Sequence, residues 1–110
     1  GSGTRFVFEA SALPALEGAL DLARAGIETG GAGHNRRFVA PSFELDPATT
    51  PERVTLAFDP QTSGGLLAAI EPAQLEAVEA GLAAVGVASW RVGRVDPASG
   101  DAGPGVVLVP

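Results

Sequence analysis

Apolar residues recur every three or four positions in two stretches of the chain, which is the spacing of one face of an amphipathic helix. The first stretch follows Ser11, a favourable N-cap, and carries Leu16 and Leu20 on the same face. It predicts a helix over residues 12–25, with Pro14 in the first turn, where its missing N–H group is no loss.

The second stretch begins at Pro72 and places Leu75, Val78 and Leu82 on one face, with glutamates on the other. It predicts a helix that ends before Gly86. A third, short helix is expected over residues 51–58, because Thr50-Pro51 offers an N-cap followed by a proline at the first helical position.

Strand-like runs separate these helices. They cover residues 5–10, 65–70, 88–96 and 106–109. The run GLLAAI at 65–70 is apolar throughout and predicts a central strand buried on both faces. Residues 26–45 hold four glycines and show no helical period, which predicts a loop leading into an extended stretch over residues 37–43. Together the elements predict a single α+β domain, a mixed sheet covered by helices.

Composition and charge exclude several classes of function. The formal net charge is −6, and the seven basic residues are all arginine and are not clustered beyond the pair Arg36-Arg37, so the chain lacks the basic surface of a nucleic-acid-binding protein. No apolar run approaches the length of a membrane span. Without cysteine there is no thiolate nucleophile, and the lone His34 cannot hold a metal ion without carboxylate help. Trp90 is expected to pack in the core or at a sheet edge.

The stretch DPQTSGGLL, residues 59–67, is the first candidate for chemistry. It places two hydroxyls beside two glycines, whose backbone can approach a ligand without a Cβ in the way. Successive N–H groups in such a segment can also bind an anion. The alternative, favoured by spacing alone, is a tight Asp-Pro turn that ends a helix. A Walker loop is excluded, because Leu66 stands where the lysine would follow.

The stretch TGGAGHNRRF, residues 29–38, is the second candidate. Its backbone amides and the amide of Asn35 are groups that can contact a phosphate, with Arg36 or Arg37 supplying positive charge. The alternative is a solvated surface loop, which is the commoner outcome for this composition.

Together the two stretches resemble parts of one family, the selenophosphate synthetases, also called selenide, water dikinases. DPQTSGGLL is similar to the signature near the end of these enzymes, and residues 12–39 resemble the helix and Gly-Gly-x-x-x-Asn loop that precede it. The resemblance covers residues 3–109. The chain departs from the family at Ala32-Gly33-His34, where threonine and basic residues are common.

The resemblance implies a fold like the later part of the C-terminal domain of aminoimidazole ribonucleotide synthetase, with α/β/α layers and partly ferredoxin-like, over residues 1–110. It also implies a cytoplasmic parent enzyme that converts selenide, ATP and water to selenophosphate, AMP and phosphate with Mg²⁺. The partner of this chain would be the N-terminal ATP-binding half of the same protein, which forms a homodimer.

The family's catalytic Cys or selenocysteine, its lysine and its metal-binding aspartates belong to other segments, and this chain has neither Cys nor Lys. We therefore expect the chain alone to be inactive, without catalytic or metal-binding residues. The candidate phosphate- or substrate-cleft residues are Gly30, Gly31, Asn35, Asp59, Gln61, Thr62, Ser63, Gly64 and Gly65. Two alternatives remain open: a stand-alone binding or regulatory module with this fold, or part of another ATP-dependent enzyme of the same superfamily.

Overall fold

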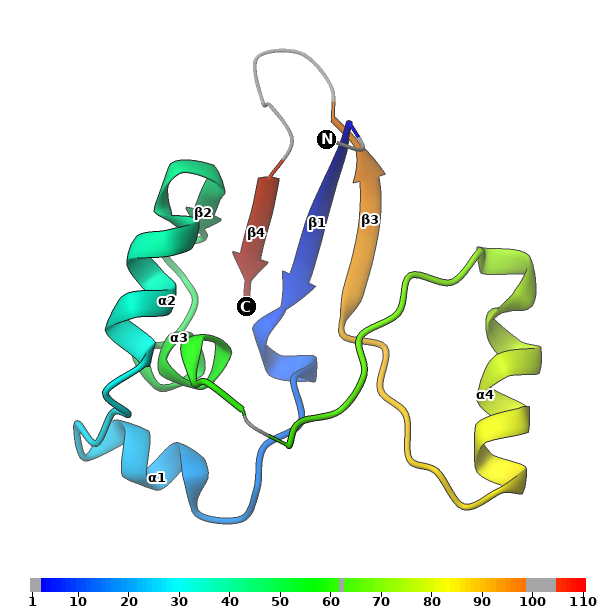
Figure 1. Cartoon of the computed structure of the whole chain (residues 1–110), viewed down its shortest axis with the longest axis horizontal. Helices are drawn as coiled ribbons and strands as arrows, with labels where there is room; N and C mark the ends of the chain where they lie inside the picture. The colour runs from blue at the N-terminus through cyan, green and yellow to red at the C-terminus, as the bar shows by residue number, and fades with distance from the viewer. Residues whose placement is uncertain (1–2, 62, 99–104) are drawn as a thin grey trace.

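The computed structural model describes residues 3–61, 63–98 and 105–110, and Figure 1 shows their arrangement. The strands are β1 (Thr4–Glu9), β2 (Phe43–Leu45), β3 (Gly93–Pro97) and β4 (Gly105–Val109). The α-helices are α1 (Ala19–Arg24), α2 (Ala32–Val39), α3 (Pro51–Phe58) and α4 (Leu75–Ala84). Short 3-10 turns are η1 (Ala10–Ala12), η2 (Ala40–Ser42) and η3 (Pro72–Gln74).

The four strands form one mixed sheet in the order β2-β4-β1-β3. Strand β1 pairs antiparallel with β3 and parallel with β4, and β4 pairs parallel with β2. Phe6 lies opposite Val106 and Phe8 opposite Leu108, so these four side chains share one face of the sheet. The predicted α+β class and mixed sheet are confirmed.

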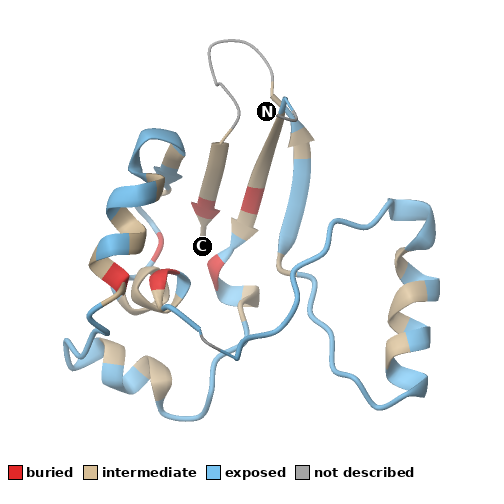
Figure 2. Ribbon diagram, viewed as in Figure 1, coloured by how far each residue is buried: buried red, intermediate tan, exposed pale blue. Residues whose placement is uncertain are grey.

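Helices α2 and α3 pack against this face. Phe58 of α3 meets Phe43 of β2 edge to face, with ring centroids 5.1 Å apart. The most buried apolar side chains come from the sheet, the turn after β1 and these two helices (Figure 2). They are Val7, Ala10, Ala32, Phe58 and Leu108. Helix α4 stands apart from the sheet (Figure 1), and none of its residues is buried.

Several sequence predictions are confirmed. The strands predicted over 5–10 and 106–109 are β1 and β4, and the helix predicted over 51–58 has the bounds of α3. The helix predicted after Pro72 is η3 followed by α4.

The helix predicted over 12–25 is wrong in its first half, since α1 begins only at Ala19. Leu13 is extended, with φ −66° and ψ 123°, because the ring of the following proline disfavours helical backbone at the residue before it. The chain then turns through Gly18, whose φ of 78° lies in the left-handed region, and the helix starts there.

The loop predicted over 26–45 is also wrong, because residues 32–39 form helix α2 and the extended stretch begins only at Phe43. Packing explains the difference. Ala32 is fully buried and the side chain of Asn35 is bonded to α3, so tertiary contacts stabilise a helix that propensity and periodicity do not indicate.

The central strand predicted over 65–70 is not formed, and Leu66 and Leu67 are 103% and 66% exposed. Both sides of β1 are already occupied, by β3 and β4. The strand predicted over 88–96 begins only at Gly93. Trp90 therefore lies before β3 and is 58% exposed, neither in the core nor in the sheet.

Candidate functional site

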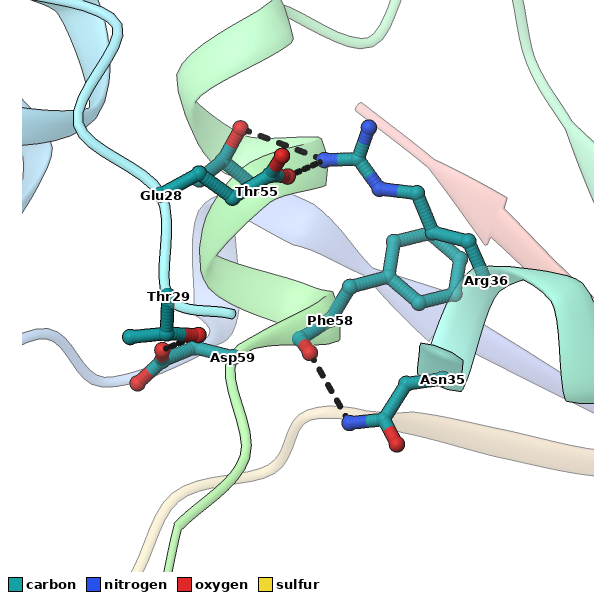
Figure 3. A network of polar contacts seen from close by, with 7 residues as sticks. All are labelled: Glu28, Thr29, Asn35, Arg36, Thr55, Phe58 and Asp59. Atoms are coloured by element: carbon teal, nitrogen blue, oxygen red, sulfur yellow. Dashed lines mark hydrogen bonds and ion pairs between the residues drawn. The ribbon is translucent and has the colours of Figure 1, made fainter. Parts of the chain in front are cut away.

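The two glycine-containing stretches singled out in the sequence lie side by side. The hydroxyl of Thr29 donates a hydrogen bond of 2.9 Å to Oδ1 of Asp59 (Figure 3). The side-chain amide of Asn35 donates one of 3.0 Å to the backbone carbonyl of Phe58, the last residue of α3. Residues 30 and 23 positions apart in sequence are thus joined at the start of α2 and the end of α3.

A close steric contact lies between these two bonds. A Cβ built on Gly31 would stand 2.7 Å from Cγ of Pro60, closer than real Cβ atoms approach other atoms. A Cβ on the neighbouring Gly30 would meet nothing within 4 Å. Only the second glycine of the pair is therefore required by packing.

The carboxylate of Asp59 is bonded on both oxygens. Thr29 donates to Oδ1, and the side-chain amide of Gln61 donates to Oδ2. The backbone N–H of Asp59 also donates to the carbonyl of Leu56, which ends α3. The side chains of Asp59, Gln61 and Asn35 thus form hydrogen bonds within the chain.

The remaining candidates of the bend face solvent. Ser63, Gly64 and Gly65 are all exposed, and a Cβ on Gly65 would meet nothing within 4 Å. Gly64 is closer to its surroundings, since a Cβ there would stand 3.0 Å from Cβ of Gln61. Thr62 lies outside the described residues.

Arg36 anchors the segment that enters α2. Its guanidinium forms an ion pair with Glu28, donates a 3.4 Å hydrogen bond to the hydroxyl of Thr55 and lies 5.3 Å from the ring centroid of Phe58 (Figure 3). Its charge is therefore balanced by a neighbouring carboxylate, whereas Arg37 is exposed.

The ionisable groups with shifted pKa values lie outside these two loops. Hydrogen bonding to Arg5 lowers the pKa of Glu44, and hydrogen bonding to Arg91 lowers that of Glu79. The pKa of Glu52 is lowered first by its own backbone N–H group at the start of α3. Among the described residues there is no group of three or more His, Asp or Glu that could hold a metal ion.

Neither of two cavities includes a described residue of the bend. One, of about 350 Å³, lies between the sheet and helices α2 and α3, and Asn35 contributes the only amide to its lining. Its other lining residues are Phe8, Leu13, Val39, Phe43, Ala57, Phe58, Val106 and Leu108. The other, of about 410 Å³, is an open hollow beside α1 that includes Arg24 and Arg53. A helix that is long and apolar enough to span a membrane is not found in the described part of the chain.

No protein-family model matches the chain. Curated proteins do match it. A selenide, water dikinase of Nitratidesulfovibrio vulgaris (strain DSM 19637 / Miyazaki F) is 37% identical over 94 residues, 86% of this chain and 27% of that protein. One of Pelobacter propionicus is 39% identical over 87 residues, 79% of this chain and 24% of that protein. One of Haemophilus influenzae is 32% identical over 99 residues, 90% and 28% of the two chains. The chain is a relative of the selenide, water dikinases.

This chain spans about a quarter of the length of the selenide, water dikinases it matches. The aligned length in the Haemophilus influenzae relative, 99 of 110 residues, is long enough that it must include most of both loops. The similarity to selenide, water dikinases thus extends well beyond the nine residues 59–67.

Sequence reasoning missed three participants of this site, namely Thr29, Pro60 and Glu28. Thr29 is adjacent to the paired glycines, and a hydroxyl before a glycine pair was a signal that could have been used. The partners of Pro60 and Glu28 depend on how α2 packs on α3, and a single sequence gives no sign of that.

Proposed function

We propose that this chain is the later part of the C-terminal domain of a selenide, water dikinase. The parent enzyme would convert selenide, ATP and water to selenophosphate, AMP and phosphate in the cytoplasm. The observation that carries the proposal is the convergence of the two loops, joined by Thr29 to Asp59 and by Asn35 to Phe58, in a relative of these enzymes. Two segments that resemble the same family separately also meet in space.

The contribution of this chain would be one wall of the cleft that holds the phosphates. The exposed bend Ser63–Gly65 offers a hydroxyl and backbone without Cβ, and Gly30 offers open backbone in the opposing loop. Both features suit contact with anionic oxygens, since backbone N–H groups are good donors to them. Asn35, Asp59 and Gln61 would support this wall from behind.

ATP and Mg²⁺ would be held mainly elsewhere in the parent. The described residues do not fit a metal site, because they bring together no three carboxylates or histidines, and the chain has no lysine to neutralise phosphate charge. We therefore assign no catalytic step to this chain. The N-terminal half of a homodimeric parent would supply the metal ligands and the reacting groups.

The activity is tested on the full-length protein that contains this chain. AMP formation that depends on selenide supports the proposal. ATP turnover that is indifferent to selenide points to another ATP-dependent enzyme, and absence of ATP turnover points to a non-catalytic module.

The role of the bend is tested separately, by titrating the same protein with ATP after Ser63→Ala. Ser89→Ala is the matched control, because it makes the same chemical change at an exposed site outside both loops. We expect weaker ATP binding for Ser63→Ala alone. Equal affinity of the two variants would reduce the bend to a turn.

A further inference from the structure

The first three residues of DPQTSGG differ from the last three in what they contact. Asp59 and Gln61 bond within the chain and Pro60 lies against Gly31, whereas Ser63 and the two glycines after it are exposed. We infer that Asp59 and Pro60 are positioning residues, which lock the Gly30-Gly31 loop to the bend so that the two loops present one rigid edge. Its use for ligand binding rests on the proposed function; the lock itself does not.

The steric part of the lock is the contact of Gly31 with Pro60. Gly31 has φ −80° and ψ −22°, an ordinary helical conformation that any residue adopts, so its backbone does not demand glycine. The available space does require glycine, because a Cβ on residue 31 would stand 2.7 Å from Cγ of Pro60, 3.4 Å from its Cβ and 3.7 Å from its Cδ. The proline ring thus occupies the place that a side chain would fill.

The polar part of the lock is the carboxylate of Asp59. One oxygen accepts from Thr29 across the two loops, and the other accepts from Gln61 within the bend. Asp59 therefore joins the glycine loop to the segment that leads into Ser63. On the other side of the contact, Asn35 bonds the carbonyl of Phe58, so three consecutive residues of the 58–60 segment are held by the 29–35 segment.

A simpler role for Asp59 and Pro60 would be to end helix α3. Proline stops a helix and the residue before it is driven to extended backbone, and Asp59 does have φ −66° and ψ 123°. That role needs no partner in the other loop. It predicts that changes at Gly31 and Pro60 act independently, whereas the lock predicts that they are coupled.

The steric part is tested by a double-mutant cycle in the full-length protein, read by Tm. Gly31→Ala should lower the Tm by a few degrees, while Gly30→Ala, the matched control in open space, should change it little. Pro60→Ala removes Cγ and Cδ and leaves the Cβ contact at 3.4 Å. The Gly31→Ala/Pro60→Ala protein should therefore recover most of the loss caused by Gly31→Ala, and Pro47→Ala should give no such recovery. Equal effects of Gly30→Ala and Gly31→Ala, or additive effects in the cycle, would overturn the lock.

The polar part is tested by comparing Asp59→Asn with Asp59→Ala. Asparagine keeps an acceptor for Thr29, and the amide of Gln61 can turn to present its oxygen, so Asp59→Asn should retain the affinity for ATP and the Tm. Asp59→Ala should raise the KM for ATP severalfold, with a smaller change in kcat. If Asp59→Asn is as damaging as Asp59→Ala, the negative charge itself is needed, and Asp59 is not a positioning residue. The Tm measurements decide the lock even if the protein makes no selenophosphate.

Discussion

The hydrogen bond from Asn35 to the carbonyl of Phe58 offers the most direct test of how helices α2 and α3 are held together. Asn35→Ala removes the donor but leaves the carbonyl of a residue that is only 8% exposed. A net hydrogen bond contributes about 0.5–1.5 kcal/mol, and a buried group left without a partner costs about 1–3 kcal/mol. We expect a loss of about 1–2 kcal/mol in the free energy of unfolding.

Urea denaturation followed by circular dichroism measures this loss. With an m-value of about 2 kcal/mol/M, the midpoint should fall by roughly 0.5–1 M while m stays constant. His34→Ala is the matched control, since His34 is the preceding residue of the same helix and is exposed. If Asn35→Ala and His34→Ala shift the midpoint equally, the hydrogen bond from Asn35 to Phe58 does not hold α2 on α3.

Three further predictions follow from the exposed, charged and aromatic parts of the chain. Leu66→Lys/Leu67→Lys should reduce self-association of the isolated chain, because both leucines are exposed in an apolar run. Sedimentation velocity measures this self-association. The prediction is contradicted if the unchanged chain is already monomeric. Glu44 and Glu79 have lowered pKa values in the folded chain. The stability that these two carboxylates contribute to the fold is therefore fully present above about pH 5, and it is lost as the pH falls through their folded pKa values. Glu44→Gln should therefore flatten the fall of Tm between neutral and acid pH, and an unchanged slope would argue against the pairing. Phe58→Ala should cost about 3–5 kcal/mol, measured by the same urea denaturation, because the ring is buried; a loss below about 1 kcal/mol would mean that α3 is not packed as described.

The sequence was a good guide where an element carries its own signals. Thr50-Pro51 marks the start of α3 and Asp59-Pro60 its end, and the helix has those bounds. The apolar residues after Pro72 likewise indicate α4. In these cases the deciding interactions are local, so periodicity and turn residues are sufficient.

The sequence was a poor guide to secondary structure where contacts with other elements determine it. Helix α2 contains glycine, histidine, asparagine and two arginines, and it is held by the contacts of Ala32, Asn35 and Arg36 with other elements. Residues 65–70 show the opposite case. Their apolar side chains favour a strand, but this segment does not pair with the four-stranded sheet. An apolar run indicates that burial of its residues is favourable, but it does not indicate which element will cover them.

At the candidate site, too, local sequence signals predicted some features, whereas others depended on packing. The sequence indicated both loops, because glycines and hydroxyls mark places where backbone approaches something closely. It did not distinguish Gly31, which meets Pro60, from Gly30, which meets open space. That difference depends on how the loop before α2 packs on the segment after α3, and it gives Gly31 a packing contact that Gly30 lacks.

A crystal structure of the full-length protein with Mg²⁺ and a non-hydrolysable ATP analogue would show whether this chain forms a wall of the phosphate cleft. We predict that the Ser63–Gly65 bend and Gly30 border the phosphates, with Asp59 still bonded to Thr29 behind them. A nucleotide bound far from both loops, or an Asp59 released from Thr29 to coordinate the metal ion, would contradict it.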